Sequence, residues 1–200
     1  KLIIQLVKNK PILIVAGEPN SVFFEIFFKS IKKEVYKSPL ILICCKKNLL
    51  SQMKKFNFNR KIQILNPKNL DIKKINNKKI NLINVELYNS NIKKLKLKLK
   101  TNYIERCFNL SFQLIRNGFT DKLINGPINK KTFLNNKFLG VTEYIASKFN
   151  KKKIGMLIYN KELSVSPLTT HLPLKLVSKN ITKKLINEKI TIINNFFKKT

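Results

Sequence analysis

The sequence predicts an α/β fold with a largely parallel sheet. Short, continuous apolar runs alternate along the chain with segments whose apolar residues recur at helical spacing, as in strands joined by crossover helices. The run from Pro11 to Ala16, PILIVA, is apolar and rich in β-branched residues, as a strand buried on both faces requires. The chain has 200 residues, 44% of them hydrophobic, which is enough for a sizeable core.

Further strands and helices are expected after this first strand. The turn Gly17-Glu18-Pro19-Asn20 ends it, and Asn20 or Ser21 can cap a helix whose apolar face runs from Phe24 to Ile31. We expect strands at 39–45 and 61–65 and a helix at 49–56.

The segment 66–100 is the hardest to interpret. It is rich in Asn and Lys, and residues 94–100 alternate lysine with leucine, which favours an edge strand. Helical spacing returns at Thr101, and Gly118 is a suitable C-terminal stop for that helix.

The rest of the chain predicts a second α/β region. The expected elements are a strand at 122–125, a short helix at 129–136, a helix at 142–149, a hairpin of 154–159 with 163–168, and a helix from 182 into Phe196-Phe197. We therefore divide the chain into a first α/β domain, residues 1–120, and the beginning of a second domain for substrate and metal, residues 121–200.

The formal charge of +31 invites a nucleic-acid-binding interpretation. We disfavour it because only Arg60, Arg106 and Arg116 are arginines among the 41 basic residues, and the lysines spread along the whole chain. A nucleic-acid reader is expected to cluster its charge and to favour arginine. The accompanying excess of Asn, Ile and Phe is typical of A/T-rich codons. A lysine-rich nucleic-acid-binding protein stays open as an alternative from another functional class.

Cysteines and hydropathy point to a cytoplasmic protein. Cys44, Cys45 and Cys107 show no Cys-x-x-Cys spacing, so we expect buried, reduced thiols. No apolar run approaches the roughly 20 residues that a membrane span needs. The start, KLIIQLVKNKP, is too short in its apolar part for a signal peptide.

Common phosphate-binding and nucleophile motifs are absent. The five glycines form neither G-x-G-x-x-G nor a Walker A loop. The sequence also gives no support for a Ser-His-Asp triad, because it has one histidine and no nucleophile elbow. Four segments at strand ends or turns carry the candidate chemistry instead. They are Gly17–Asn20, Asn125–Lys131, Phe138–Tyr144 and Leu168–Leu174.

Two of these segments offer anion-binding groups. The turn Gly17–Asn20 places helix N-terminal amides where an anion could bind, although a plain structural turn explains it as well. In Asn125–Lys131, a Gly-Pro turn leads into a helix, and Lys130 could contact a phosphate or carboxylate or donate a proton.

The other two segments offer a helix start and an imidazole. Thr142 can cap the helix that follows, and Glu143 is one of only ten acidic residues. His171, the only histidine, stands after two hydroxyl residues at the end of an expected strand, and Pro173 then breaks the local geometry. Imidazole is the commonest metal ligand and carries protons near neutrality, so His171 is a metal-ligand candidate.

Taken in order, the four segments resemble the 4-hydroxythreonine-4-phosphate dehydrogenase family of pyridoxal phosphate biosynthesis. The strongest matches are LINGPINKKTFLN and LTTHLPLKLVS, and the resemblance covers almost the whole chain as the N-terminal portion of the family. It implies a fold like the isocitrate and isopropylmalate dehydrogenases, with two α/β domains around a cleft, in a homodimer. It also implies that the C-terminal part of the second domain is missing from these 200 residues.

The resemblance implies a specific reaction. NAD or NADP would oxidise 4-phosphooxy-L-threonine, and loss of carbon dioxide would give 3-amino-2-oxopropyl phosphate. His171 would be one of three histidines binding a catalytic divalent metal (Zn, Mg or Co), which polarises the reacting oxygen. Thr142 would bind the substrate, and Lys130 would be catalytic. The resemblance assigns no cofactor-binding residue in this chain, and it implies neither a specific nucleic acid nor a membrane as partner.

Two departures from the family matter. The family usually has a substrate-binding histidine directly before the threonine, where this chain has Val141, and its first turn continues Ala-Gly-Ile-Gly where this chain has Asn20–Phe23. Loss of a polar partner in an anion site costs on the order of 1–3 kcal/mol unless another group replaces it. A related dehydrogenase acting on a different phosphorylated hydroxy acid, and a family member without activity, are therefore alternatives.

Overall fold

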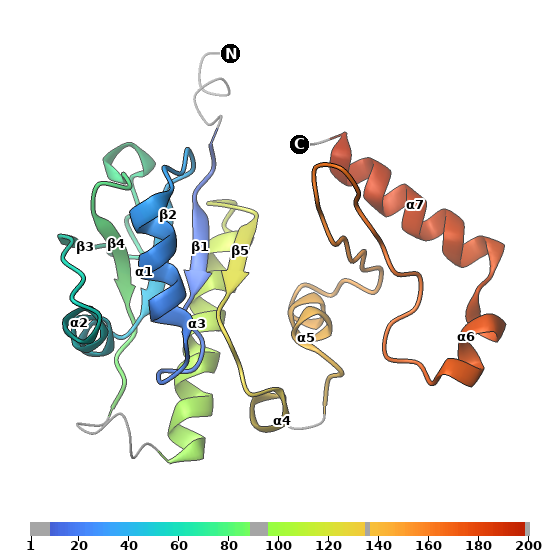
Figure 1. Cartoon of the computed structure of the whole chain (residues 1–200), viewed down its shortest axis with the longest axis horizontal. Helices are drawn as coiled ribbons and strands as arrows, with labels where there is room; N and C mark the ends of the chain where they lie inside the picture. The colour runs from blue at the N-terminus through green and yellow to red at the C-terminus, as the bar shows by residue number, and fades with distance from the viewer. Residues whose placement is uncertain (1–8, 89–95, 135–136, 199–200) are drawn as a thin grey trace. The chain divides into compact units, whose positions relative to one another are not determined.

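The computed structural model describes residues 9–88, 96–134 and 137–198. The chain divides into two compact units, Lys1–Phe133 and Leu134–Thr200 (Figure 1). The sequence placed a domain boundary between residues 120 and 121. In the structure, the strand that follows residue 121 pairs within the sheet of the first unit.

The first unit contains a five-stranded parallel sheet. Its strand order is β3-β4-β2-β1-β5, with β1 between β2 and β5 (Figure 1). The strands are β1 (Ile12–Val15), β2 (Leu40–Cys44), β3 (Ile62–Ile64), β4 (Ile80–Asn84) and β5 (Lys122–Asn125). The predicted α/β class with a parallel sheet is therefore confirmed for this unit.

Helices cover both faces of this sheet. They are α1 (Phe23–Lys33), α2 (Lys46–Lys55), α3 (Leu97–Arg116) and the short α4 (Lys130–Phe133), with a 3₁₀ turn, η2, at Ile72–Lys74. Alternate strand residues such as Ile14, Leu42 and Leu82 pack in one cluster with α1 and α2. Their neighbours Leu13 and Ile41 point to the opposite face, and α3 contacts β1 and β2 without entering that cluster. The predicted burial of the first strand on both faces is confirmed.

Two polar contacts join the beginnings of β1 and β5. The Thr120 hydroxyl donates to the carbonyl of Pro11, and Lys10 Nζ lies 3.1 Å from a carboxylate oxygen of Asp121. This ion pair lowers the pKa of Asp121 through the hydrogen bond from Lys10. The contacts tie together segments far apart in the sequence at the start of the two strands.

The structure corrects the interpretation of residues 66–100. A strand lies at Ile80–Asn84, between β2 and β3, where the sequence predicted none. Residues 97–100 form the first turn of α3 instead of an edge strand, and the edge-strand prediction is wrong there. Leu97 is 56% exposed, because the apolar residues of this turn do not lie on a packed sheet face. Residues 94 and 95 lie outside the described residues.

The second unit is mostly helical in its described residues. Helix α5 spans Val141–Lys148, α6 spans Leu174–Asn180 and α7 spans Lys183–Phe197. The expected hairpin appears as a single antiparallel bridge between Ile158 and Val165. The predicted start of the last helix at residue 182 is confirmed: Thr182 is the N-cap of α7, and its hydroxyl accepts from Leu185 N at 3.1 Å.

Helix α6 was not expected, because Pro173 was interpreted only as a break. Proline instead precedes this helix directly, where its restricted φ and missing N–H are tolerated. Within the described part of the second unit, Leu134 and Tyr144 are the only buried large hydrophobic residues. The second unit therefore has a much smaller core of its own than the first. Across the described ranges, none of the helices is long and apolar enough to cross a membrane.

The three cysteines are free and buried, as the sequence predicted. Burial raises the pKa of Cys107 to about 12 and raises the pKa of Cys44 well above its ordinary value.

Because the thiolate is the nucleophile, native protein at pH 8 is expected to resist iodoacetamide at all three cysteines, whereas protein unfolded in urea is alkylated at all three. Mass spectrometry of both samples checks this. Equal labelling rates in the two samples would contradict the burial of these thiols.

The side chain of Asn77 fixes the loop that leads into β2. Its Nδ2 donates to the carbonyls of Tyr36 and Ser38, each at 2.9 Å, and its Oδ1 accepts from Leu40 N at 2.8 Å.

Asn77→Ala removes all three bonds and is expected to lower the free energy of unfolding by about 1–3 kcal/mol in urea titrations. The control Asn66→Ala removes one exposed turn contact, to Lys68 N. A loss no greater than that of the control would show that the loop does not depend on Asn77.

Candidate functional site

Two turns meet at the carboxyl edge of the sheet in the first unit. The first, from Gly17, follows β1, and the second, Gly126-Pro127, follows β5. Gly126 N donates to Val15 O at 2.7 Å, and Glu18 N donates to Pro127 O at 2.9 Å. Because ligands of open α/β sheets bind at this edge, the two turns form a candidate anion or cofactor region.

Glycine is required at both turns because the backbones approach closely. A Cβ on Gly126 would lie 2.2 Å from Ala16 O, and a Cβ on Gly17 would lie 2.3 Å from Pro127 O. Gly17 also has a φ of +76°, in the left-handed region that favours glycine. Of the two expected caps, Ser21 accepts a hydrogen bond from Phe23 N at 3.3 Å at the start of α1.

Asn48 fastens the first turn to α2. This residue is 1% exposed, and its Nδ2 donates to Pro19 O at 2.9 Å, while its Oδ1 has no partner. Sequence reasoning missed Asn48. In a chain so rich in asparagine, nothing in the local pattern distinguishes it from exposed asparagines.

Lys130 lies in the first unit, at the first residue of α4. The Asn129 side chain accepts from Thr132 N at 3.3 Å and so caps this short helix. Lys130 is exposed. Its ammonium group is thus free to meet an anionic group from solution.

The remaining predicted site residues gather in the second unit, at the start of α5. Gly140 is the N-cap, and its carbonyl accepts from Tyr144 N at 3.1 Å. Thr142 was expected to be the cap. It is instead an exposed residue of the first turn, and Val141 before it is partly buried.

His171 lies beside this helix start. A Cβ built on Gly140 would be 3.8 Å from His171 Nε2 and 2.7 Å from Glu143 Oε2. The absence of a side chain at Gly140 therefore leaves space into which both groups reach. Glu143 Oε2 is buried and has no hydrogen-bond partner.

The backbone of His171 is unusual. Its φ of +59° lies in the left-handed region, which non-glycine residues seldom adopt. Such a conformation persists when the surrounding structure holds it, and it often marks a functional position. Among the residues that the structure describes, no group of three or more His, Cys, Asp or Glu side chains could hold a metal ion. His171 would need ligands from elsewhere.

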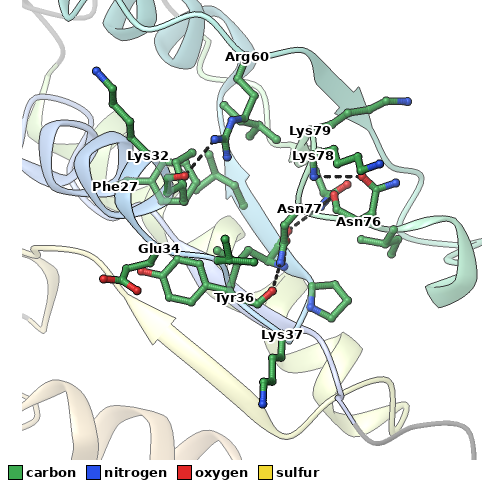
Figure 2. Close-up of a pocket in the computed structure, with 18 of the residues that line it drawn as sticks. Phe27, Lys32, Glu34, Tyr36, Lys37, Arg60, Asn76, Asn77, Lys78 and Lys79 are labelled. Atoms are coloured by element: carbon green, nitrogen blue, oxygen red, sulfur yellow. Dashed lines mark hydrogen bonds between the residues drawn. The ribbon is translucent and has the colours of Figure 1, made fainter.

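A cavity of about 540 Å³ lies in the first unit, at the opposite edge of the sheet, where β2 and β4 begin. Figure 2 shows Lys32, Lys37 and Lys79 extending in three different directions rather than toward a common point. Arg60 is already engaged, since its guanidinium donates to Ile31 O at 3.0 Å. This cavity contains none of the predicted site residues, and we assign it no role.

Comparison with known proteins decides the family. The family model of the pyridoxal phosphate biosynthetic protein PdxA matches residues 37–200, which include Lys130, Val141, Thr142 and His171 but not the first turn, Gly17–Asn20. The chain belongs to the PdxA family. This confirms the resemblance that the motifs indicated.

Relatives of known name support the PdxA assignment. The 4-hydroxythreonine-4-phosphate dehydrogenase of Wigglesworthia glossinidia brevipalpis is 29% identical over 193 residues, and that of Sulfurihydrogenibium is 29% identical over 191. These alignments cover 94% and 92% of this chain. The chain spans 57% of the length of either relative.

Solved structures show the same PdxA fold. The 4-hydroxythreonine-4-phosphate dehydrogenase of Klebsiella pneumoniae matches with a TM-score of 0.78 at 21% identity, covering 96% of this chain and 59% of that one. The enzyme from Burkholderia phymatum matches with a TM-score of 0.77 at 20% identity, covering 92% and 56%. At these identities the structural similarity concerns the fold.

The contact between the two turns generates a stability prediction. Gly126→Ala is expected to lower the free energy of unfolding by about 3 kcal/mol, because the new Cβ meets rigid backbone. Gly118→Ala is the matched control: Gly118 has a φ of +74° but open space around it, so its cost is about 1 kcal/mol. Urea unfolding of the two variants measures the difference. An equal or smaller loss for Gly126→Ala would contradict the close approach of the turns.

Proposed function

We propose that this chain forms the N-terminal portion of a 4-hydroxythreonine-4-phosphate dehydrogenase. The observation that carries the proposal is the match of the PdxA family model to residues 37–200 together with the site residues within that range. The whole protein would have the isocitrate dehydrogenase-like arrangement of two α/β domains around a cleft and would work as a cytoplasmic homodimer.

The proposed reaction consumes 4-phosphooxy-L-threonine and NAD⁺ or NADP⁺. Hydride leaves the carbon that bears the hydroxyl group for the nicotinamide, and the hydroxyl proton is released. The bond between the carboxylate carbon and the amino-bearing carbon then breaks and liberates carbon dioxide, and the amino-bearing carbon takes up a proton. The products are 3-amino-2-oxopropyl phosphate, NADH or NADPH, and carbon dioxide.

Chain residues have separate proposed roles. Lys130, exposed at the start of α4, would contact an anionic group of the substrate or transfer a proton. Thr142, exposed on the first turn of α5, would donate its hydroxyl hydrogen to the substrate. Val141 would contribute a contact without hydrogen bonding or charge. The residues that bind the nicotinamide cofactor are not assigned.

His171 fits a divalent metal such as Zn, Mg or Co. Its imidazole is exposed, its backbone is held in a strained conformation, and the space left by Gly140 lies beside Nε2. When bound, the metal supplies Lewis-acid polarisation of the reacting oxygen. The role of the chain is to hold the imidazole in place for it.

Val141 supports a second candidate within the same enzyme class. An apolar side chain where the family usually has histidine removes a hydrogen bond and a charge from the substrate site. A related dehydrogenase with another phosphorylated hydroxy acid as substrate would accommodate that change.

The function is tested by reduction of the nicotinamide, followed at 340 nm. The full-length gene product is assayed with 4-phosphooxy-L-threonine, with and without divalent metal, beside its His171→Ala variant. We expect metal-dependent turnover that falls at least about a hundredfold in the variant, the scale of a lost metal contact. Turnover that persists unchanged in His171→Ala would contradict the metal role, and no turnover by folded protein would leave Val141 and a different substrate as the next test.

A further inference from the structure

The strand order of the first unit changes direction beside β1. From β1 the chain passes through α1 to β2 on one side, and it later returns through α3 to β5 on the other side (Figure 1). Helices α1 and α3 pack on opposite faces of the sheet. In open α/β sheets, dinucleotides bind outside the carboxyl ends of the strands at such a switch point. The turn Gly17–Asn20, which follows β1, lies at this position.

A buried amide holds this turn from the side of α2. Asn48 is 1% exposed, and its Nδ2 donates to Pro19 O at 2.9 Å. From the side of β5, the turn is held by the bond from Glu18 N to Pro127 O, also 2.9 Å long. Asn48 therefore sets the position of the turn relative to α2.

The start of α2 is a fixed base for Asn48. The hydroxyl of Tyr103, from α3, accepts from Cys45 N at 2.8 Å, and Asn84 Oδ1, at the end of β4, accepts from Lys46 N at 2.7 Å. These two bonds occupy backbone N–H groups that an anion at the helix start would otherwise use. The start of α2 is therefore an anchor rather than an anion site, and Asn48 joins that anchor to the turn.

The amide of Asn48 is a poor choice for stability alone. Its Oδ1 is buried and has no hydrogen-bond partner among the described residues. A buried acceptor without a donor costs at least as much free energy as one neutral hydrogen bond contributes, so the two effects roughly cancel. An apolar side chain of similar volume would pack at this position without that cost. The amide is thus expected to matter for the place of the turn more than for the stability of the fold.

We propose that Asn48 is a positioning residue for the nicotinamide cofactor, which binds over the turn Gly17–Asn20 at the carboxyl end of β1. This role rests on the proposed function, which supplies the cofactor, and it adds a binding region that the function leaves unassigned. Helix α1 begins at Phe23, directly after the turn, and N–H groups at a helix start favour the negative pyrophosphate of a dinucleotide.

The test is the affinity of the full-length gene product for NADH and NADPH, measured by the change in nicotinamide fluorescence on binding. Asn48→Leu keeps the approximate side-chain volume and removes the donor, so Pro19 O is expected to turn toward water and the turn to shift. We expect the Kd to rise about tenfold, the scale of one lost hydrogen bond. In turnover, the KM for the cofactor is expected to rise likewise, with kcat and the KM for 4-phosphooxy-L-threonine within about twofold of the parent.

Asn77→Ala is the matched control. Asn77 also donates to backbone carbonyls, but at the opposite edge of the sheet, where β2 begins. Its loss is expected to lower the free energy of unfolding and to leave the cofactor Kd within about twofold of the parent. Asn48→Leu is expected to weaken cofactor binding with a smaller loss of stability than Asn77→Ala.

A second variant guards against a poor fit of leucine. Asn48→Ala removes the same donor without filling the space, and it is expected to weaken cofactor binding in the same direction. Parent-like cofactor affinity in both Asn48 variants, or a rise in KM confined to 4-phosphooxy-L-threonine, would overturn the proposal.

The outcomes separate this role from the proposed function. Turnover of 4-phosphooxy-L-threonine, with cofactor affinity indifferent to Asn48, would leave the dehydrogenase standing and refute the positioning role. Binding of NADH or NADPH that depends on Asn48, in a protein that does not oxidise 4-phosphooxy-L-threonine, would support the positioning role and refute the proposed substrate.

Discussion

The parallel pairing of β1 with a neighbour on each side is the interaction on which the first unit depends. Backbone hydrogen bonds hold β1 to β2 along one edge and to β5 along the other. Because parallel strands end at the same edge of a sheet, this pairing brings the turns at Gly17 and Gly126 into contact. The contact is so close that only hydrogen fits where a Cβ would stand. The apolar faces of β1 then determine where α1, α2 and α3 can pack.

Much of this arrangement could be predicted from the sequence. The continuous β-branched run PILIVA predicted β1, since a strand buried on both faces leaves that pattern, and strands were also predicted at β2, β3 and β5. The strand β4 was missed because its sequence, INLIN, places Asn81 inside an apolar run within a stretch of lysine and asparagine. Asn81 is 1% exposed, and its Nδ2 donates to the carbonyls of Leu40 and Asn76. Because these hydrogen bonds satisfy the amide group of Asn81, a polar residue that seems to interrupt the apolar run can lie inside a buried strand.

The candidate site was predictable only in part. Residue type and position after a turn or strand identified Lys130, Thr142 and His171. Glu143 was noted only as a rare acid at a helix start. Its distinguishing properties are a buried oxygen and a neighbouring glycine whose missing side chain makes room. Both are three-dimensional properties that no spacing rule encodes. The left-handed backbone of His171 is equally invisible in the sequence, since non-glycine residues seldom adopt that conformation.

The contacts that join β1 to β5 also constrain the order of events during synthesis. Lys10 and Asp121 are separated by 111 positions, and Thr120 reaches the carbonyl of Pro11 across 109. A growing chain therefore makes β1, β2, β3 and β4 well before the strand that completes the sheet emerges from the ribosome. Until then one edge of β1 is an open row of N–H and C=O groups, available for pairing with other chains. Non-local pairing of this kind slows folding in general, so the β1 edge is expected to stay open to pairing with other chains until β5 has been made.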